Sequence, residues 1–320
     1  MNLIVIHSKL LFSRYNRTKL RITTYTYLNL LSISFLTIFL SCKKSESNTF
    51  LNNLNLSEIY SGFKPKNETI STKDSTSNIV TTDSLYYQYK DRVQEIDSTK
   101  QYVYLTFDDG PFKGSQKINK IIQEEQVKAT VFVVGMNAYT DKLQQYLKDY
   151  EDNDWIEVSN HTFSHANRNK FKQYYDNPEM VLSDVIKNDS AYNFKNRFVR
   201  LPGRNVWRLG DHKKNDYDNG SKISSDYLAQ NQYFVFGWDY EWNKISKKKS
   251  LDNSSEIYDG IVKRLNNKET FKEKHLVILM HDDMFDNDDD AEQLRALIKM
   301  IKNNKNIVFE VASNYPISLS

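Results

Sequence analysis

The chain has 320 residues, of which 39% are hydrophobic, enough for one large domain or two small ones. It carries 44 basic and 41 acidic residues, and residues 1–42 contain several of the basic ones and no acidic one. Because the remainder is slightly acidic, we do not expect nucleic acid as a partner.

The first predicted element is a targeting segment at residues 1–42. Basic residues ending at Arg21 precede the run LNLLSISFLTIFLSC, and its apolar part is short for a membrane span and typical of a signal peptide. The run ends at Cys42, the only cysteine, and resembles a bacterial lipoprotein signal, although Phe39 replaces the usual Leu. The resemblance implies a lipidated Cys42 that anchors the protein to a membrane of the cell envelope. The alternatives are an uncleaved anchor and a buried cysteine in a core helix.

Residues 43–100 are rich in Ser, Thr, Asn, Lys and Asp, as in KNETISTKDSTSN. Their low apolar content predicts a polar tether rather than a domain. From residue 101 the pattern changes to short apolar runs that alternate with amphipathic segments. We therefore expect one folded domain over residues 101–320.

Seven apolar, β-branched and aromatic runs in this domain are predicted strands. They are YVYLTF (102–107), TVFVV (130–134), WIEVS (155–159), RFVRL (197–201), YFVFGW (233–238), HLVILM (275–280) and NIVFEV (306–311). The segments between them have helical periodicity, at 115–126, 140–152, 178–188, 254–267 and 290–304. Alternating strands and helices predict an α/β fold with a parallel sheet. Seven units indicate a (β/α) barrel with one unit fewer than usual, with a doubly wound open sheet as the alternative.

Ionisable side chains follow several of these strands, where functional groups gather in α/β folds. They are Asp108 and Asp109 after the first strand, His161 and His165 after the third, Arg200 at the end of the fourth, Asp239 and Glu241 after the fifth, and His281 after the sixth. Two adjacent carboxylates repel each other unless a positive group lies nearby. This concentration of Asp, His and Arg predicts a functional site at the carboxyl edge of the sheet.

The spacing of His161 and His165 suits a metal ion. On one helical turn, residues four apart share a face, so their two imidazoles can chelate one cation, although such pairs are often only surface or core residues. With an aspartate from another strand they form a site that leaves positions open for water and substrate. A cation would also explain the paired carboxylates, one as a ligand and the other free as a base.

Five segments, LTFDDGP, SNHTFSH, RLPGR, GWDYEW and LMHD, resemble in order the motifs of the polysaccharide deacetylase (NodB homology) family, carbohydrate esterase family four. The resemblance covers roughly residues 101–315. It implies a distorted (β/α)7 barrel and metal-dependent removal of acetyl groups from a glycan. The favoured partner is an acetylated polysaccharide of the cell envelope or its surroundings, such as peptidoglycan or a chitin-like N-acetylglucosamine polymer.

The resemblance also implies a role for each matching residue. Asp109, His161 and His165 would hold the metal, Zn²⁺ or alternatively Co²⁺ or Ni²⁺. Asp108 would be the general base, His281 the general acid, and Arg200 the residue that orients Asp108. The remaining roles are Thr162 in holding the histidine turn, a backbone N–H near Gly203 in stabilising the oxyanion, and Leu279 with Trp238 or Trp242 in lining the acetyl pocket.

Two motifs depart from the family pattern. Gly203 follows Pro202 where the family usually has an aromatic residue, so this position offers an N–H but no aromatic wall. In the fourth motif an Asp usually stands directly before the Trp and pairs with the acid histidine, whereas here Glu241 stands there. Either Asp239 or Glu241 could pair with His281, and Asp239 is preferred because it falls at the strand end.

Three other functions are compatible with parts of the sequence. One is an O-acetyl esterase acting on xylan or an exopolysaccharide, which would use the same machinery. The second is a glycan-binding lipoprotein without catalysis, which would need neither Asp108 nor His281, and the third is metal storage or sensing. The acidic run at 282–290 lacks the pattern of a calcium loop and predicts a helix N-terminus. His275 precedes its strand and is expected to be structural.

Overall fold

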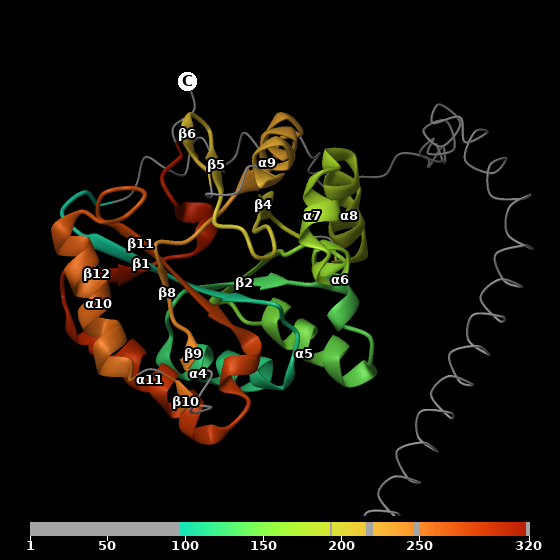
Figure 1. Cartoon of the computed structure of the whole chain (residues 1–320). Coiled ribbons are helices and arrows are strands. Elements are labelled where there is room, and N and C mark those ends of the chain that lie inside the picture. The colour runs from blue at the N-terminus through green and yellow to red at the C-terminus, as the bar shows by residue number, and fades with distance from the viewer. Residues whose placement is uncertain (1–96, 193, 216–219, 246–249, 252, 318–320) are drawn as a thin grey trace, which may run out of the picture. The chain divides into compact units, whose positions relative to one another are not determined.

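The computed structural model describes residues 97–192, 194–215, 220–245, 250–251 and 253–317 (Figure 1). The predicted signal at 1–42 and nearly all of the predicted tether at 43–100 lie outside these residues, so both stay predictions. None of the helices in the described ranges has the length and apolar composition needed to span a bilayer.

The core of the fold is a ten-stranded sheet in the order β6-β5-β7-β4-β3-β2-β1-β11-β8, with β12 also paired to β1. All seven predicted strands are present. They are β1 (Gln101–Asp108), β2 (Ala129–Val133), β3 (Ile156–Asn160), β4 (Phe198–Val199), β7 (Phe234–Val235), β11 (His275–His281) and β12 (Ile307–Phe309). These strands and β8 (Tyr240–Glu241) pair in parallel. Their carboxyl ends therefore meet at one edge.

Four short strands that were not predicted extend or accompany the sheet. Strands β5 (Trp207–Leu209) and β6 (His212–Lys214) add an antiparallel edge beside β7. Strands β9 (Lys244–Ile245) and β10 (Ser250–Leu251) form a separate two-stranded ribbon.

The five predicted helices are confirmed, and the described residues contain three more. The predicted ones are α4 (Lys113–Glu125), α5 (Asp141–Glu151), α8 (Pro178–Tyr192), α10 (Ser254–Asn267) and α11 (Asp288–Asn303). The additional ones are α6 (His165–Asn169), α7 (Phe171–Tyr175) and α9 (Gly220–Gln230). Short 3-10 turns are η2 (Gly135–Asn137), η3 (Asp282–Phe285) and η4 (Ala312–Asn314). Asn287 caps α11, whose first turn carries three Asp residues, so the acidic run begins a helix as predicted.

The two faces of β1 pack against different parts of the core. Val103, Leu105 and Phe107 alternate onto one face and join the cluster that includes the apolar sides of α4, α10 and α11. Tyr102 and Tyr104 point to the other face, where they pack in an aromatic cluster with residues of β5, β7 and η4. Fully burying one such side chain stabilises the fold by roughly 1.5–3 kcal/mol.

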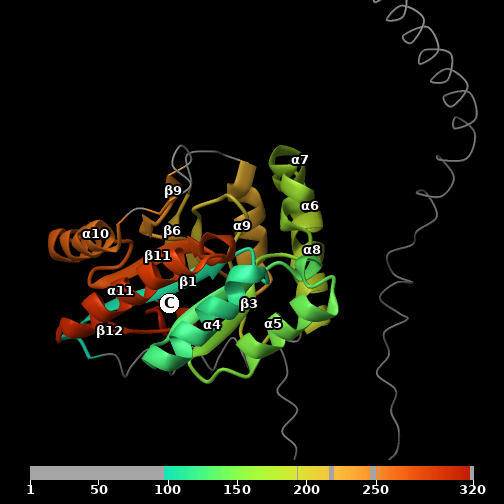
Figure 2. The same cartoon turned by 90° about the horizontal axis from the view of Figure 1, so that it is seen from below.

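The helices lie around the outside of a curled sheet (Figure 1). Seen from below, α4 lies between α11 and α5 across one side of it (Figure 2). This arrangement is a distorted (β/α) barrel, as the resemblance implied. The fold brings the carboxyl ends of β1, β3, β4 and β11 together, and these strands carry most of the predicted site residues.

Candidate active site

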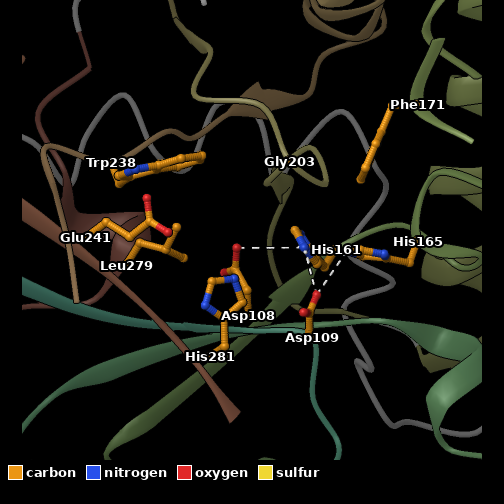
Figure 3. Close-up of a pocket in the computed structure, with 10 residues that line it drawn as sticks. All are labelled: Asp108, Asp109, His161, His165, Phe171, Gly203, Trp238, Glu241, Leu279 and His281. Carbon is orange, nitrogen blue, oxygen red and sulfur yellow. Dashed lines mark ion pairs between the residues drawn. The ribbon is translucent and has the colours of Figure 1, made fainter. Parts of the chain in front are cut away.

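A cavity of about 320 Å³ opens at the carboxyl edge of the sheet (Figure 3). Its lining residues are Asp108, Asp109, His161, His165, Phe171, Gly203, Trp238, Glu241, Leu279 and His281. Most of the predicted site residues are therefore brought together, and Arg200 lies directly behind Asp108. The exceptions are Asp239 and Trp242.

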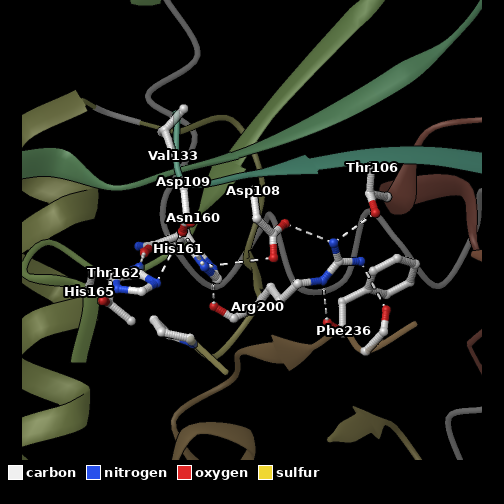
Figure 4. Close-up of polar contacts among 12 residues, drawn as sticks. Thr106, Asp108, Asp109, Val133, Asn160, His161, Thr162, His165, Arg200 and Phe236 are labelled. Carbon is white, nitrogen blue, oxygen red and sulfur yellow. Dashed lines mark hydrogen bonds and ion pairs between the residues drawn. The ribbon is translucent and has the colours of Figure 1, made fainter. Parts of the chain in front are cut away.

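The adjacent carboxylates at the end of β1 point to different partners. Asp109 has a backbone φ of 74°, in the left-handed region, which Asp tolerates better than most residues. The side-chain amide of Asn137 donates to its carbonyl oxygen over 2.7 Å and holds this turn. Asp108 consequently faces Arg200, whereas Asp109 faces the histidines (Figure 4).

Asp108 is held by a buried arginine. The Nη1 group of Arg200 donates to Oδ1 of Asp108 over 2.8 Å and to the hydroxyl of Thr106 over 2.7 Å. Its other nitrogens donate to the carbonyl oxygens of Phe236 and Gly237. Burial lowers the pKa of Arg200, and the Asp108 carboxylate opposes that effect. Arginine stays protonated in proteins, so Asp108 has a fixed positive partner, as predicted.

Two imidazoles converge on one carboxylate oxygen. Oδ1 of Asp109 lies 3.0 Å from Nε2 of His165 and 3.3 Å from Nε2 of His161. This oxygen is buried and accepts no hydrogen bond within the described part of the chain. Ligands around a tetrahedral Zn²⁺ with bonds of about 2.0–2.1 Å lie roughly 3.3 Å apart. The three groups can thus hold one cation, and they are the predicted ligands.

The other nitrogen of each ring fixes its orientation. Nδ1 of His161 lies 2.8 Å from the carbonyl oxygen of Arg200, and Nδ1 of His165 lies 2.5 Å from Oδ1 of Asn169. Each acceptor requires a proton on Nδ1, which leaves the lone pair of a neutral ring on Nε2, toward Asp109. Such outer bonds are typical of metal-binding histidines.

The route by which the two histidines meet differs from the predicted helical turn. His161 follows β3 directly, and residues His165–Asn169 form a turn in the left-handed region, with φ between 50° and 66°. Left-handed residues cost roughly 1–2 kcal/mol each, so other contacts must hold the turn. The hydroxyl of Ser164 accepts from the backbone N–H of Asn167 and donates to the Asp184 carboxylate.

The charges of the site agree with its contacts. Burial raises the pKa of Asp109, but the two histidine rings more than offset this and hold its pKa well below the usual range. Burial lowers the pKa of His165, but the neighbouring Asp109 carboxylate outweighs this, so that its pKa is raised. The centre therefore favours a carboxylate beside positive charge, whether that charge is a proton or a metal ion.

His281 lies at the end of β11, the strand next to the one that carries Asp108. Residues Asp108 and His281 are register partners in the parallel pairing of β1 and β11. Both side chains line the cavity, from the ends of adjacent strands. A predicted base and a predicted acid are therefore delivered to one cavity by neighbouring strands.

Asp239 does not pair with His281, contrary to the prediction. Its two carboxylate oxygens accept from the backbone N–H groups of Phe271 and Val277, over 2.6 and 2.9 Å. Asp239 lies level with Val277, four residues before His281 on β11, which is about 13 Å along the strand. Burial raises the pKa of Asp239 to about 6. The side chain ties two segments together at a distance from the cavity.

Glu241, the alternative to Asp239, lines the cavity. Glu241 is the register partner of Leu279, which lies two residues before His281 on β11. Within the described residues its carboxylate makes no hydrogen bond or ion pair with His281 (Figure 3). Among the described residues, His281 therefore pairs with neither of the two carboxylates that the resemblance offered as its partner.

The three apolar residues expected in the acetyl pocket divide into two groups. Trp238 and Leu279 line the cavity, as predicted. Trp242 does not, because its side chain is fully buried in the main core and packs edge-on against Phe285. Alternation along β8 explains the difference, since Glu241 points into the cavity and the next residue points away.

Sequence reasoning missed Phe171 altogether. This residue begins α7 and lines the cavity beside Gly203, although it lies far from Gly203 in the sequence. The segment FKQYY carries no motif, and the only available hint was the absence of an aromatic residue at position 203.

Comparison with known proteins bears on the same region. Residues 95–205 match the sequence model of the polysaccharide deacetylase family. The match supports a polysaccharide deacetylase domain. It includes the predicted metal ligands, Asp108 and Arg200, and ends before the strand that carries His281.

Two individual proteins are similar to this chain. Chitin disaccharide deacetylase of Vibrio alginolyticus is 27% identical, over 45% of this chain and 48% of its own length. The chain thus spans about half the length of this curated relative. A CE4 esterase structure from Streptococcus mutans has a TM-score of 0.51 at 21% identity, over 71% of this chain and 90% of that one. The structural similarity confirms the predicted type of barrel.

Proposed function

We propose that this protein is a metal-dependent deacetylase that hydrolyses acetyl groups on an N-acetylated glycan, such as peptidoglycan or a chitin-like N-acetylglucosamine polymer. The observation that carries the proposal is the convergence of two imidazole Nε2 atoms on one buried, unbonded carboxylate oxygen of Asp109, beside an arginine-bound carboxylate. The family match over residues 95–205 supports the same reaction class.

Asp109, His161 and His165 would hold the cation, for which Zn²⁺ is favoured and Co²⁺ or Ni²⁺ are alternatives. When bound, such a cation would polarise the acetyl carbonyl and lower the pKa of a water molecule. The chain's own residues would keep the lone pair of each imidazole on Nε2, and they would keep hydrogen-bond donors away from Oδ1 of Asp109. The acceptors at the two Nδ1 atoms perform the first part of that task.

Asp108 would take the proton of the attacking water. Its Oδ1 is occupied by Arg200, and its Oδ2 faces His161 at 3.7 Å from Nε2. The free oxygen is therefore the one directed at the metal ligands, where the water would add to the acetyl carbon. Arg200 would keep Asp108 in this orientation through its bond to Oδ1, while three further hydrogen bonds hold Arg200 itself in place.

His281 would give a proton to the leaving nitrogen as the carbon–nitrogen bond breaks, so that acetate and a free amine leave the site. A backbone N–H near Gly203 would stabilise the negative oxygen of the tetrahedral intermediate. Trp238 and Leu279 would line the space for the acetyl methyl group.

Acetate release tests the proposal. We would incubate the purified protein with chitooligosaccharides, peptidoglycan and acetylated xylan, with and without added Zn²⁺ or Co²⁺. Metal-dependent release from an N-acetyl glycan is expected, and Asp108→Asn should lower it by about 10²–10⁴-fold. Asp226→Asn is a matched control, because Asp226 also binds an arginine but lies outside the cavity.

Two results would contradict this proposal. Release from acetylated xylan alone would make the protein an O-acetyl esterase. Binding of metal and glycan without any release would make it a binding protein.

We also propose that Cys42 is lipidated and holds the protein at the cell envelope. The support is the sequence alone, since residues 1–96 are not described. Incorporation of labelled palmitate should be lost in Cys42→Ala, and the variant should move from the detergent phase to the aqueous phase in a partition assay. Equal partition of both forms would contradict the proposal.

A further inference from the structure

We propose that Phe171 and Trp238 form two walls that hold the pyranose ring of the substrate, so that Phe171 determines specificity for a sugar-borne acetyl group. The inference rests on the proposed deacetylase function. It adds Phe171 to the residues of the cavity and gives a physical reason why a sugar-borne acetyl group is preferred to a small ester.

The position of Phe171 supports a wall rather than a core residue. Its side chain is only half-buried and lines the cavity. Its ring stands edge-on to the ring of His165, with centroids 6.3 Å apart and planes at 75°. A ring that touches a predicted metal ligand and remains open to the cavity lies where the bound substrate must pass.

Gly203 makes room for this ring. A Cβ atom at position 203 would lie 3.2 Å from two ring carbons of Phe171, tighter than ordinary van der Waals contact. The backbone φ of Gly203 is also +63°, which favours glycine. The aromatic wall that position 203 does not carry is therefore supplied from α7, and a side chain at 203 would compete with Phe171 for the same space.

Contacts within the protein position the Phe171 wall before any ligand arrives. The ring of Phe171 lies parallel to the ring of Tyr175, with centroids 6.5 Å apart and planes at 4°. Tyr175 is buried, and its hydroxyl donates to the carbonyl oxygen of Pro202 over 2.6 Å. The stack is thus tied to the loop that carries Gly203, and a preformed wall loses little conformational entropy on binding.

The opposite wall has similar support. Trp238 is fixed by Asn205, whose side chain exchanges hydrogen bonds with the backbone N–H and carbonyl of Trp238 over 3.0 and 2.8 Å. Figure 3 shows Trp238 and Phe171 on opposite sides of the cavity, with Asp108, Asp109 and His161 lower down between them and His165 below Phe171. Glu241 lies beside Trp238 and offers a carboxylate to a hydroxyl group.

This combination fits a sugar. The C–H groups of a pyranose carry partial positive charge and pack on the negative faces of aromatic rings, whereas its hydroxyl groups need acceptors such as a carboxylate. A small acetyl ester would occupy only the space near Leu279 and Asp109 and would gain little from Phe171. Phe171 should therefore matter more for a glycan than for a small ester.

The test compares two substrates in Phe171→Leu, which keeps apolar volume but removes the ring. With Zn²⁺ present, the KM for fully acetylated chitotriose should rise roughly fivefold to tenfold, the size expected for one aromatic contact. In the same variant, the KM for para-nitrophenyl acetate should rise by a factor several times smaller than the factor for chitotriose. The separate variant Phe171→Tyr, which keeps an aromatic ring, should have the wild-type KM for chitotriose. Tyr139→Leu is the matched control, because Tyr139 is 76% exposed and does not line the cavity.

A separate titration with Zn²⁺ distinguishes recognition from damage to the metal centre. Equal losses on both substrates, together with weaker Zn²⁺ binding, would mean that Phe171 only supports His165 and would overturn the inference. An unchanged chitotriose KM in Phe171→Leu would also overturn it. If the wild-type protein hydrolyses the ester but neither binds nor hydrolyses chitotriose or peptidoglycan, the proposed function itself is wrong.

Discussion

Replacing Arg200 with methionine should destabilise the protein severely, because it leaves a buried carboxylate without its counterion. Arg200 has no exposed surface, and Asp108 is only 3% exposed. The substitution removes the charged bond to Asp108 and leaves the Thr106 hydroxyl and two backbone carbonyls without this donor. Breaking a buried ion pair from one side costs about 3–5 kcal/mol.

The magnitude can be measured by urea denaturation at pH 7. A loss of 3–5 kcal/mol is a large part of the roughly 5–15 kcal/mol that stabilises a typical domain. Arg197→Met is a matched control three residues earlier. Arg197 also donates to two backbone carbonyls but lies 4.0 Å from its nearest carboxylate, on Asp189, and is partly exposed. We expect that substitution to cost about 1 kcal/mol.

A double-mutant cycle separates the pair from its surroundings. Arg200→Met combined with Asp108→Asn should cost clearly less than the sum of the two single losses, because neither charge is then left alone. If Arg200→Met unfolds at the same urea concentration as the wild type, or if the two losses simply add, the buried ion pair does not hold Asp108 as described.

Three further predictions concern metal, pH and the corrected carboxylate. Zn²⁺ at a hundredfold excess over its Kd should stabilise the wild type by about 2.7 kcal/mol in a thermal melt and leave His161→Ala unchanged; equal shifts would refute the assigned ligands. Burial lowers the pKa of His275 to about 4, so the folded state binds fewer protons than the unfolded state between pH 4 and 6.5. About 3 kcal/mol of stability should therefore be lost as pH falls through this window, and His275→Gln should remove that dependence in denaturation curves; parallel curves would refute it. Asp239→Asn should leave the rate of acetate release within about twofold of the wild type, whereas Glu241→Gln should raise the KM for the glycan by roughly fivefold. A large loss of activity in Asp239→Asn together with an unchanged KM in Glu241→Gln would place Asp239 in the site instead.

The strands and most of the site could be predicted from the sequence because both follow local rules. Apolar runs bounded by polar residues fix β1, β3 and β11, and parallel pairing brings their carboxyl ends to one edge. Asp108, Asp109 and His281 follow such ends within one or two residues. Their convergence can therefore be predicted without knowing the conformation of any loop.

The failures concern residues whose direction depends on a loop or on strand alternation. Asp239 lies before the short strand β8 and binds two backbone N–H groups there, and Trp242 takes the buried side of the same strand. His165 reaches the site through a left-handed turn that no periodicity indicates. Phe171 reaches Gly203 only through tertiary packing.

The structure also explains why the two neighbouring carboxylates are not interchangeable. Alternation along β1 sends Asp108 inward to Arg200, and the left-handed backbone of Asp109 turns the next side chain toward the histidines. A carboxylate with one oxygen held by a fixed donor keeps a single free oxygen in a set direction, which suits a base. A buried carboxylate oxygen without a donor suits a cation. The order of two identical residues therefore assigns two different tasks, because the backbone between them changes direction.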